Sequence, residues 1–358
     1  MSSAPYVTPT QLTASYPLGV SWQTIGKTAS TDPSPQQNMA ALASVCRLAS
    51  NEVDSELGQT TRTLFVAEAE RGPSHRIGFL PGSGMARMMT NWHPIRKVIQ
   101  GAFAPTGQFP KTFTVMQPGT IFAEQQPQGF YGTTTPDPYH GGDNSLLISG
   151  AYVNWCWGRN GTEVWATYLN GWPHAAMPAG SDADVTTLAV DDVTGMAGAA
   201  PWITDSTYTE QVYVIEATPA DPAGWSATVT YPAGVTVAYG GTAYQATIPS
   251  GPGTQFGPQT PPATGYWSTT IEPAGPGTLT LAAPTLFAHD AGTVITAQPE
   301  DILWAAALYA KAQALQRGLA TLTRQGPGGS GPSQSTDEAI AAAISEAVAR
   351  LSPFRRIL

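Results

Sequence analysis

The sequence predicts an α+β fold in which helices from the N- and C-terminal parts of the chain form a body that carries a large β-rich insertion. Three observations lead to this prediction. Apolar residues recur at helical spacing near both ends, over residues 42–57 and 302–322. Gly and Pro number 37 and 32 of 358 residues, which indicates many turns. Between the ends, short apolar runs recur about every ten residues, as in β-sandwiches and barrels.

Two helices are expected in the N-terminal part, over residues 1–60. Thr8 precedes Pro9, a residue favoured at the first helical position, and a longer helix is expected after Pro33. The apolar face of this longer helix consists of Leu42, Cys46, Ala49, Val53 and Leu57. Gly58 then ends the helix, because glycine favours the position just after a helical C-terminus.

The middle of the chain is predicted to be built from strands. We divide it into a β-rich domain at residues 61–221, a small β module at 222–272 and return strands at 273–298. Apolar runs bounded by turn residues predict strands. The clearest of them are 145–148, 151–157, 162–169, 186–190, 209–217 and 278–281.

The C-terminal part, residues 299–358, is again predicted to be helical. Acidic residues at Glu300 and Asp301 fall in the first turn of a helix, where the helix dipole favours them. Its apolar stripe is rich in Ala, so neighbouring helices can approach closely. Residues 325–335 have the composition of a flexible linker, and a last helix begins at Thr336.

Composition narrows the classes of function. Only 11% of residues are charged and the net charge is −9, with no long basic run. This argues against a protein that holds nucleic acid by neutralising phosphates. So few charges also indicate that much of the surface is buried against partners. No apolar stretch reaches membrane-spanning length and no secretory signal is visible, so we expect a soluble protein made in a cytoplasm.

No enzyme is predicted. The five histidines, His75, His93, His140, His174 and His289, are not paired at metal-ligand spacing. Phosphate-binding loops and nucleophile elbows are absent from the sequence, and Asp191-Asp192 reads as a turn more than as a cation site. Cys46 and Cys156 are expected to be small buried residues. We therefore expect no cofactor and no metal.

Aromatic residues define a possible binding module. Trp225, Tyr239, Tyr244 and Trp267 surround a predicted hairpin whose turn is Gly240-Gly241. This pattern resembles the short chitin-binding type of carbohydrate-binding module, in which exposed rings stack on sugars. The resemblance covers residues 225–267 and implies these four residues as a carbohydrate site. Two interpretations stay open: a sugar-binding module, or a structural module whose rings only form its core.

Most of the rest of the chain resembles head-to-tail adaptor (connector) proteins of tailed bacteriophages. The resemblance is carried by successive segments, among them GPSHRIGFLPGSGMAR (72–87), GRNGTEVWATYLNGWPH (158–174), TTLAVDDVTGMAGA (186–199) and LSPFRRIL (351–358). It implies a dodecameric ring in the neck of the virion, which binds the portal protein and a tail or stopper protein while genomic DNA passes through. The implied portal-docking residues are Leu351, Phe354, Arg355, Arg356 and Leu358.

A second class of function stays open. In a tail-associated receptor- or carbohydrate-binding protein, the β-rich middle would bind surface glycans and the helices would anchor it. Oligomeric state separates the two classes, because twelvefold rings favour the adaptor and trimers favour a fibre.

Overall fold

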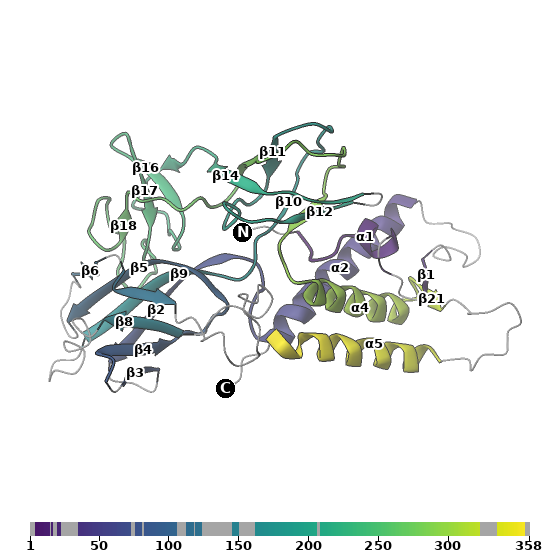
Figure 1. The fold of residues 1–358 in the computed structure, drawn as a ribbon, viewed down its shortest axis with the longest axis horizontal. Coiled ribbons are helices and arrows are strands. Elements are labelled where there is room, and N and C mark those ends of the chain that lie inside the picture. The colour runs from purple at the N-terminus through teal and green to yellow at the C-terminus, as the bar shows by residue number, and fades with distance from the viewer. Residues whose placement is uncertain are drawn as a thin grey trace, which may run out of the picture.

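The computed structural model describes most of the chain. The described residues are 4–14, 16, 20–22, 35–72, 76–80, 82–105, 112–117, 119–123, 145–149, 162–205, 208–322 and 335–354. Figure 1 shows an elongated molecule with helices gathered at one side and strands over the remainder.

Helices from both ends of the chain pack together. Helix α4 lies between α2 and α5 (Figure 1), and its residues 305–310 are all buried, so it is covered on every side. Helix α5 packs on α4 through Ala339, Ala343 and Ala347, whose small side chains let the two helices approach closely. The helices are α1 (Pro9–Ala14), α2 (Pro35–Leu57), α4 (Glu300–Gln316), α5 (Thr336–Leu351) and the short 3-10 helix η1 (Ser352–Phe354). Beside them β1 (Val20–Ser21) pairs with β21 (Thr321–Leu322).

Two four-stranded antiparallel sheets share the first β core. Val66, Met88, Ile148 and Tyr168 are among the buried residues between them. One sheet has the order β2 (Leu64–Gly72), β9 (Thr162–Asn170), β5 (Ile95–Pro105) and β6 (Thr114–Val115). The other has the order β3 (Ile77–Leu80), β4 (Met85–Met89), β8 (Ser145–Ser149) and β7 (Ile121–Ala123).

A second β core lies between a four-stranded and a three-stranded sheet. Leu188, Ile203, Val214 and Leu279 are buried there from four different strands. The larger sheet has the order β10 (His174–Ala176), β20 (Val294–Thr296), β12 (Trp202–Thr204) and β13 (Thr209–Gln211). The smaller has the order β11 (Thr187–Val190), β19 (Gly277–Leu281) and β14 (Val214–Pro219).

The small module is a sheet that packs on the β2–β9–β5–β6 sheet and forms a separate hydrophobic cluster with it. Its strands are β15 (Ala223–Gly224), β16 (Thr236–Tyr239), β17 (Thr242–Ala246) and β18 (Trp267–Ser268). Tyr266 and Trp267 of the module lie in one hydrophobic cluster with Ala102 of β5, Trp165 of β9 and Phe113. The module therefore shares a core with the β2–β9–β5–β6 sheet.

The predicted fold class is wrong. A helical body with a β insertion is not what the structure shows, because 34% of the described residues are in strands and 23% are helical. Three of the four hydrophobic clusters are built mainly from strands and the loops between them. The helical stripes were conspicuous in the sequence, whereas the strands are short and each buries few residues. Summed over the chain, these short strands form most of the fold.

The positions of individual strands and helices agree with the prediction better than the fold class does. The predicted strands near 145–148, 162–169, 186–190 and 278–281 correspond to β8, β9, β11 and β19. The predicted run 209–217 is two strands, β13 and β14, and the run 151–157 lies outside the described residues. Helix α4 ends at Gln316, before the predicted Leu322, because Gly318 adopts a φ of 67° that ends the helix. Among the described residues no helix is both long and apolar enough to cross a lipid bilayer.

Candidate functional site

The C-terminal segment is fixed firmly to the molecule as far as Phe354. Ser335 and Glu338 form a reciprocal capping box at the start of α5. Near its end, Arg350 forms an ion pair with Asp301 of α4 at 2.7 Å and lies over the ring of Trp304. Both contacts hold α5 against α4.

Two of the predicted portal-docking residues are buried in the chain's own core. Leu351 is fully buried, and Phe354 packs edge-to-face on Trp172 with ring centroids 5.8 Å apart. The Phe354 carbonyl lies 3.2 Å from Nε2 of His93. Leu351 and Phe354 thus anchor the segment. Arg355, Arg356 and Leu358, the other predicted docking residues, lie outside the described residues.

The four predicted carbohydrate-binding residues lie on one face of the small sheet. Val237 of β16 is directly opposite Tyr244 of β17, and Ala246 is opposite Trp267 of β18. The N–H of Trp225 donates to the Ala238 carbonyl, which places Trp225 beside Tyr239. Cross-strand neighbours point to the same side of a sheet, so the structure brings all four rings to one face.

The same face changes from buried to exposed along its length. Trp267 is buried, and its indole N–H donates to the carbonyl of Gln259 at 2.8 Å. Tyr244 is half-buried against the same cluster. Trp225 is also half-buried and meets Tyr239 edge-to-face at 5.6 Å, while Tyr239 is 40% exposed. Tyr239 is therefore the most exposed of the four rings, while Trp225 and Tyr244 are half-buried.

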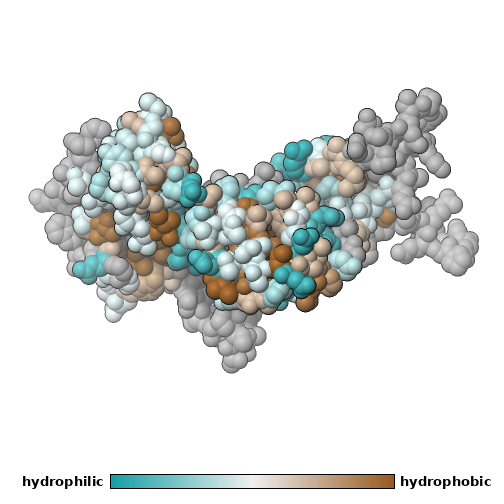
Figure 2. Space-filling model, turned by 90° about the horizontal axis from the view of Figure 1, so that it is seen from above, coloured by the Kyte–Doolittle hydropathy of each residue, from teal (hydrophilic) through white to brown (hydrophobic). Residues whose placement is uncertain are grey.

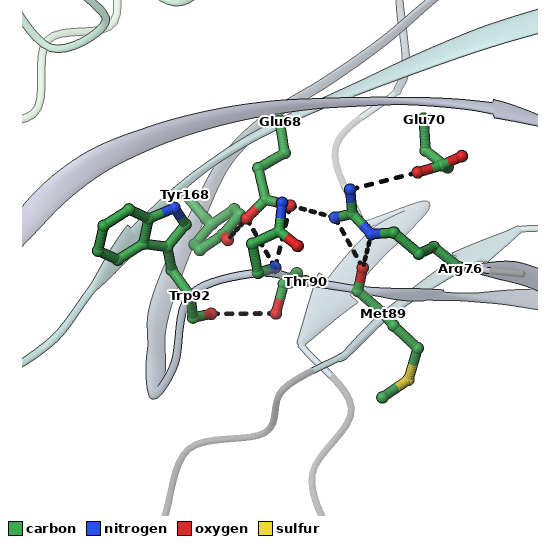
Figure 3. A network of polar contacts seen from close by, with 8 residues as sticks. Glu68, Glu70, Arg76, Met89, Thr90, Trp92 and Tyr168 are labelled. Atoms are coloured by element: carbon green, nitrogen blue, oxygen red, sulfur yellow. Dashed lines mark hydrogen bonds and ion pairs between the residues drawn. The ribbon is translucent and has the colours of Figure 1, made fainter. Parts of the chain in front are cut away.

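A buried polar network in the first β core holds three strands together (Figure 3). Glu68 of β2 accepts hydrogen bonds from the Tyr168 hydroxyl, from Arg76 and from the N–H of Asn91. Arg76 also donates to the Met89 carbonyl at 3.0 Å. Burial, together with the neighbouring Glu68 carboxylate, raises the pKa of Tyr168. Because these groups bond to one another, the network is structural.

The histidines and acidic pairs that drew attention in the sequence also have structural roles. Burial lowers the pKa of His174 to about 3, and its Nδ1 lies 3.1 Å from the Thr296 hydroxyl. Asp192 accepts from the N–H of Thr194 two residues further on, and Asp191 accepts from the N–H of Ala176 in β10, so both carboxylates bind backbone N–H groups of the chain itself. Over the described ranges no group of three or more His, Cys, Asp or Glu is arranged to hold a metal ion. His75, His140 and Cys156 lie outside these ranges.

One cluster was missed in the sequence. His289 is fully buried between two carboxylates, with Nδ1 2.8 Å from Asp205 and Nε2 2.7 Å from Glu210. Since the two carboxylates lie on opposite edges of the ring, they do not converge on a single point as metal ligands do. His289 lies 79 residues or more from the two carboxylates in sequence, too far for any spacing rule to connect them.

Comparison with protein-family models, curated proteins and solved structures gives no match to this chain. The resemblances to head-to-tail adaptors and to chitin-binding modules therefore stay predictions.

Proposed function

We propose that this chain is a structural protein of a tailed-phage virion, a head-to-tail adaptor that forms a ring between the portal and the tail. The observation that carries the proposal is the way the C-terminus is held. Helix α5 is locked on α4, and Leu351 and Phe354 are buried, so residues 355–358 follow a fixed point on the molecule. Their sequence, Arg-Arg-Ile-Leu, offers two cations and two apolar side chains to a portal subunit.

Composition and charge support the same proposal. Adaptor subunits bury large surfaces against one another, which suits a chain with only 11% charged residues. A net charge of −9 repels phosphates, so genomic DNA passes through the ring without specific binding. The resemblance implies twelve copies, with a tail or stopper protein as the second partner and the virion neck as the location.

The test is deletion of residues 355–358. The truncated protein should fold and form rings, because its buried anchors are intact, yet it should lose binding to purified portal and yield heads without tails. Arg355→Ala with Arg356→Ala should act in the same direction. A matched control is Arg47→Ala with Arg71→Ala, since both of these arginines are exposed elsewhere on the molecule. Normal tailed particles from the truncated protein would contradict the proposal.

A second candidate function, carbohydrate binding, is favoured by the exposed Tyr239 ring and the half-buried Trp225 that it meets edge-to-face. Aromatic rings that a ligand can reach on one sheet face are suited to stacking on sugar rings. Calorimetric titration with chito-oligosaccharides should show binding that Tyr239→Ala abolishes. Tyr208→Ala is the control, because Tyr208 is similarly exposed at 44% but lies outside the small module, just before β13. Absence of heat with the unaltered protein would leave a structural module.

A further inference from the structure

Four buried polar side chains mark the place where the helices and the strands of the chain connect. Hydrophilic residues are ordinarily exposed to water, as over the face seen from above in Figure 2. These four are at most 5% exposed. Five of their polar atoms have no hydrogen-bond partner among the residues that the structure describes: Oγ1 of Thr63, Nδ2 and Oδ1 of Asn170, Nε1 of Trp172 and Oε1 of Gln298. Folded proteins leave few buried polar atoms unpaired, so each of these needs an explanation.

The four side chains belong to three connecting segments and their ends, which we call the junction. Residues 58–63 connect α2 to β2, residues 171–173 connect β9 to β10, and residues 297–299 connect β20 to α4. Asn170 is the last residue of β9. The junction is therefore where the chain passes between the helices and the two β cores.

Direct hydrogen bonds hold the three segments side by side. The N–H of Trp172 donates to the Thr61 carbonyl at 2.8 Å, and the N–H of Thr63 donates to the Trp172 carbonyl at 2.9 Å. The amide nitrogen of Gln298 donates to the Thr61 hydroxyl at 2.9 Å. The backbones also approach closely, since a Cβ at Gly171 would lie 2.4 Å from a backbone oxygen of the first segment. The unpartnered atoms thus lie in a part of the fold that its own contacts fix.

Equally buried groups elsewhere find their partners within the chain. Gln245 is 0% exposed, as Asn170 is, and its side chain donates to two backbone carbonyls and accepts from one backbone N–H. Trp267 is 6% exposed, against 5% for Trp172, and its indole N–H donates to a backbone carbonyl at 2.8 Å. Burial alone therefore does not account for the unpartnered atoms of the junction.

The chemistry of the five atoms narrows the ligand that would suit them. Nε1 of Trp172 and Nδ2 of Asn170 only donate, whereas Oδ1 of Asn170 and Oε1 of Gln298 only accept. Exchanging the oxygen and nitrogen of the Asn170 amide changes nothing, because neither atom has a partner. A cation would suit the oxygens alone, and an anion the N–H groups alone. Water both donates and accepts, so it suits all five atoms.

We infer that ordered internal water molecules bind in the junction and complete the hydrogen bonding of these four side chains. A buried water molecule typically bonds to about three polar groups that the chain leaves unpaired. A buried amide or indole N–H without a partner destabilises a protein, and bound water removes that penalty. The junction can thereby carry polar side chains between the apolar cores.

The experiment uses NMR of the full chain, deuterated at carbon and labelled with ¹⁵N, to detect water beside N–H protons. Cross-relaxation with water in the rotating frame has the opposite sign to chemical exchange, so the two are distinguished. The indole N–H of Trp172 and the side-chain amide of Asn170 should show cross-peaks to bound water. The matched controls, Trp267 and Gln245, should show none, because their N–H groups are bonded to backbone carbonyls. Trp172→Phe and Asn170→Leu assign the two signals by removing them, and through-bond assignment replaces a variant that does not fold.

The four signals decide between the outcomes. Cross-peaks at Trp172 and Asn170 with none at the controls would support internal water in the junction. Absence of a cross-peak at both Trp172 and Asn170 would overturn the inference. A cross-peak at only one of them would support water at that group and overturn it at the other. Cross-peaks of equal strength at Trp267 and Gln245 would also overturn it, because water would then accompany buried N–H groups whether or not the chain binds them.

Discussion

His174 shows at the residue scale how burial sets the charge of a side chain. It packs edge-to-face on Tyr6 at 5.5 Å, and Tyr6 in turn hydrogen-bonds to Asp54 of α2. Burial of the imidazole, with the positive Arg62 nearby, lowers the pKa of His174 to about 3 from its ordinary 6.5. The folded protein thus holds this histidine neutral at a junction between the helices and the strands.

We expect His174 to make stability depend on pH. Below pH 6.5 His174 is protonated in the unfolded chain, whereas in the folded protein it stays neutral down to about pH 3. As the pH is lowered through this window, the contribution of His174 to the free energy of unfolding therefore decreases, by up to about 1.4 kcal/mol per pH unit. Urea unfolding at successive pH values should show a shallower acid loss for His174→Gln. Parallel curves for the two proteins would contradict this.

His289 lies between the buried carboxylates of Asp205 and Glu210. We predict that His289→Ala lowers the free energy of unfolding by about 3 to 5 kcal/mol, because it leaves two buried carboxylates without the ring between them. Asp205→Asn and Glu210→Gln, added to His289→Ala, should recover part of the loss by removing the uncompensated charges. A loss of less than about 1 kcal/mol in the free energy of unfolding would show that the His289 cluster does not stabilise the fold as predicted.

At the scale of elements, the α4–α5 contact depends on small side chains. Ala343 of α5 is 3% exposed and faces α4, whereas Ala342 beside it is exposed. We predict that Ala343→Leu destabilises the protein by about 1 to 3 kcal/mol through overpacking. Ala342→Leu, with the same helix propensity change, should have little effect. Thermal unfolding of both variants decides the matter, and equal melting temperatures would refute the close contact.

The helices could be predicted from the sequence because each has an apolar stripe that recurs within its own residues. Strand positions were also visible, but strand partners were not. β9 pairs with both β2 and β5, and β19 pairs with β11 and β14, across long sequence separations. Such pairings follow from the packing of whole sheets, which no local period encodes.

The candidate sites divide in the same way. The bond from the Thr194 N–H to Asp192 is local, as a turn requires, whereas Asp191 accepts from Ala176 of β10 and Asp192 also accepts from Gly275, contacts that no local pattern encodes. Asp205, Glu210 and His289 meet only because β13 and the loop before β20 lie together in the fold. The resemblance implies Leu351 and Phe354 as portal-docking residues, but their burial could not be predicted from the sequence because the partners, among them Trp172 for Phe354, are distant along the chain.

At the scale of the whole molecule, the small module completes a core. Trp165, Phe113 and Ala102 are buried only together with module residues such as Tyr266. We predict that replacing residues 222–272 with a Gly/Ser linker lowers the free energy of unfolding by more than about 3 kcal/mol, since it uncovers large aromatic side chains. Denaturant unfolding measures this loss.

The control for that replacement is a two-residue insertion at the Gly240-Gly241 turn. Both glycines have positive φ, and a Cβ built on either meets no atom within 4 Å, so the insertion extends an open hairpin tip. It should leave stability unchanged. A linker variant as stable as the insertion would show that the module is separable from the sheet beneath it.

The run of residues without Lys or Arg determines how this protein behaves toward trypsin. Trypsin cleaves after those two residues, so even the fully denatured chain releases one intact peptide that begins at Asn160 and ends at Lys311. Amine-directed cross-linkers likewise find no lysine to react with from residue 160 to residue 310. Mass-spectrometric mapping of contacts within residues 160–310 therefore requires cleavage at acidic residues and carboxyl-directed coupling, for which Glu216 and Asp290 are exposed reporters.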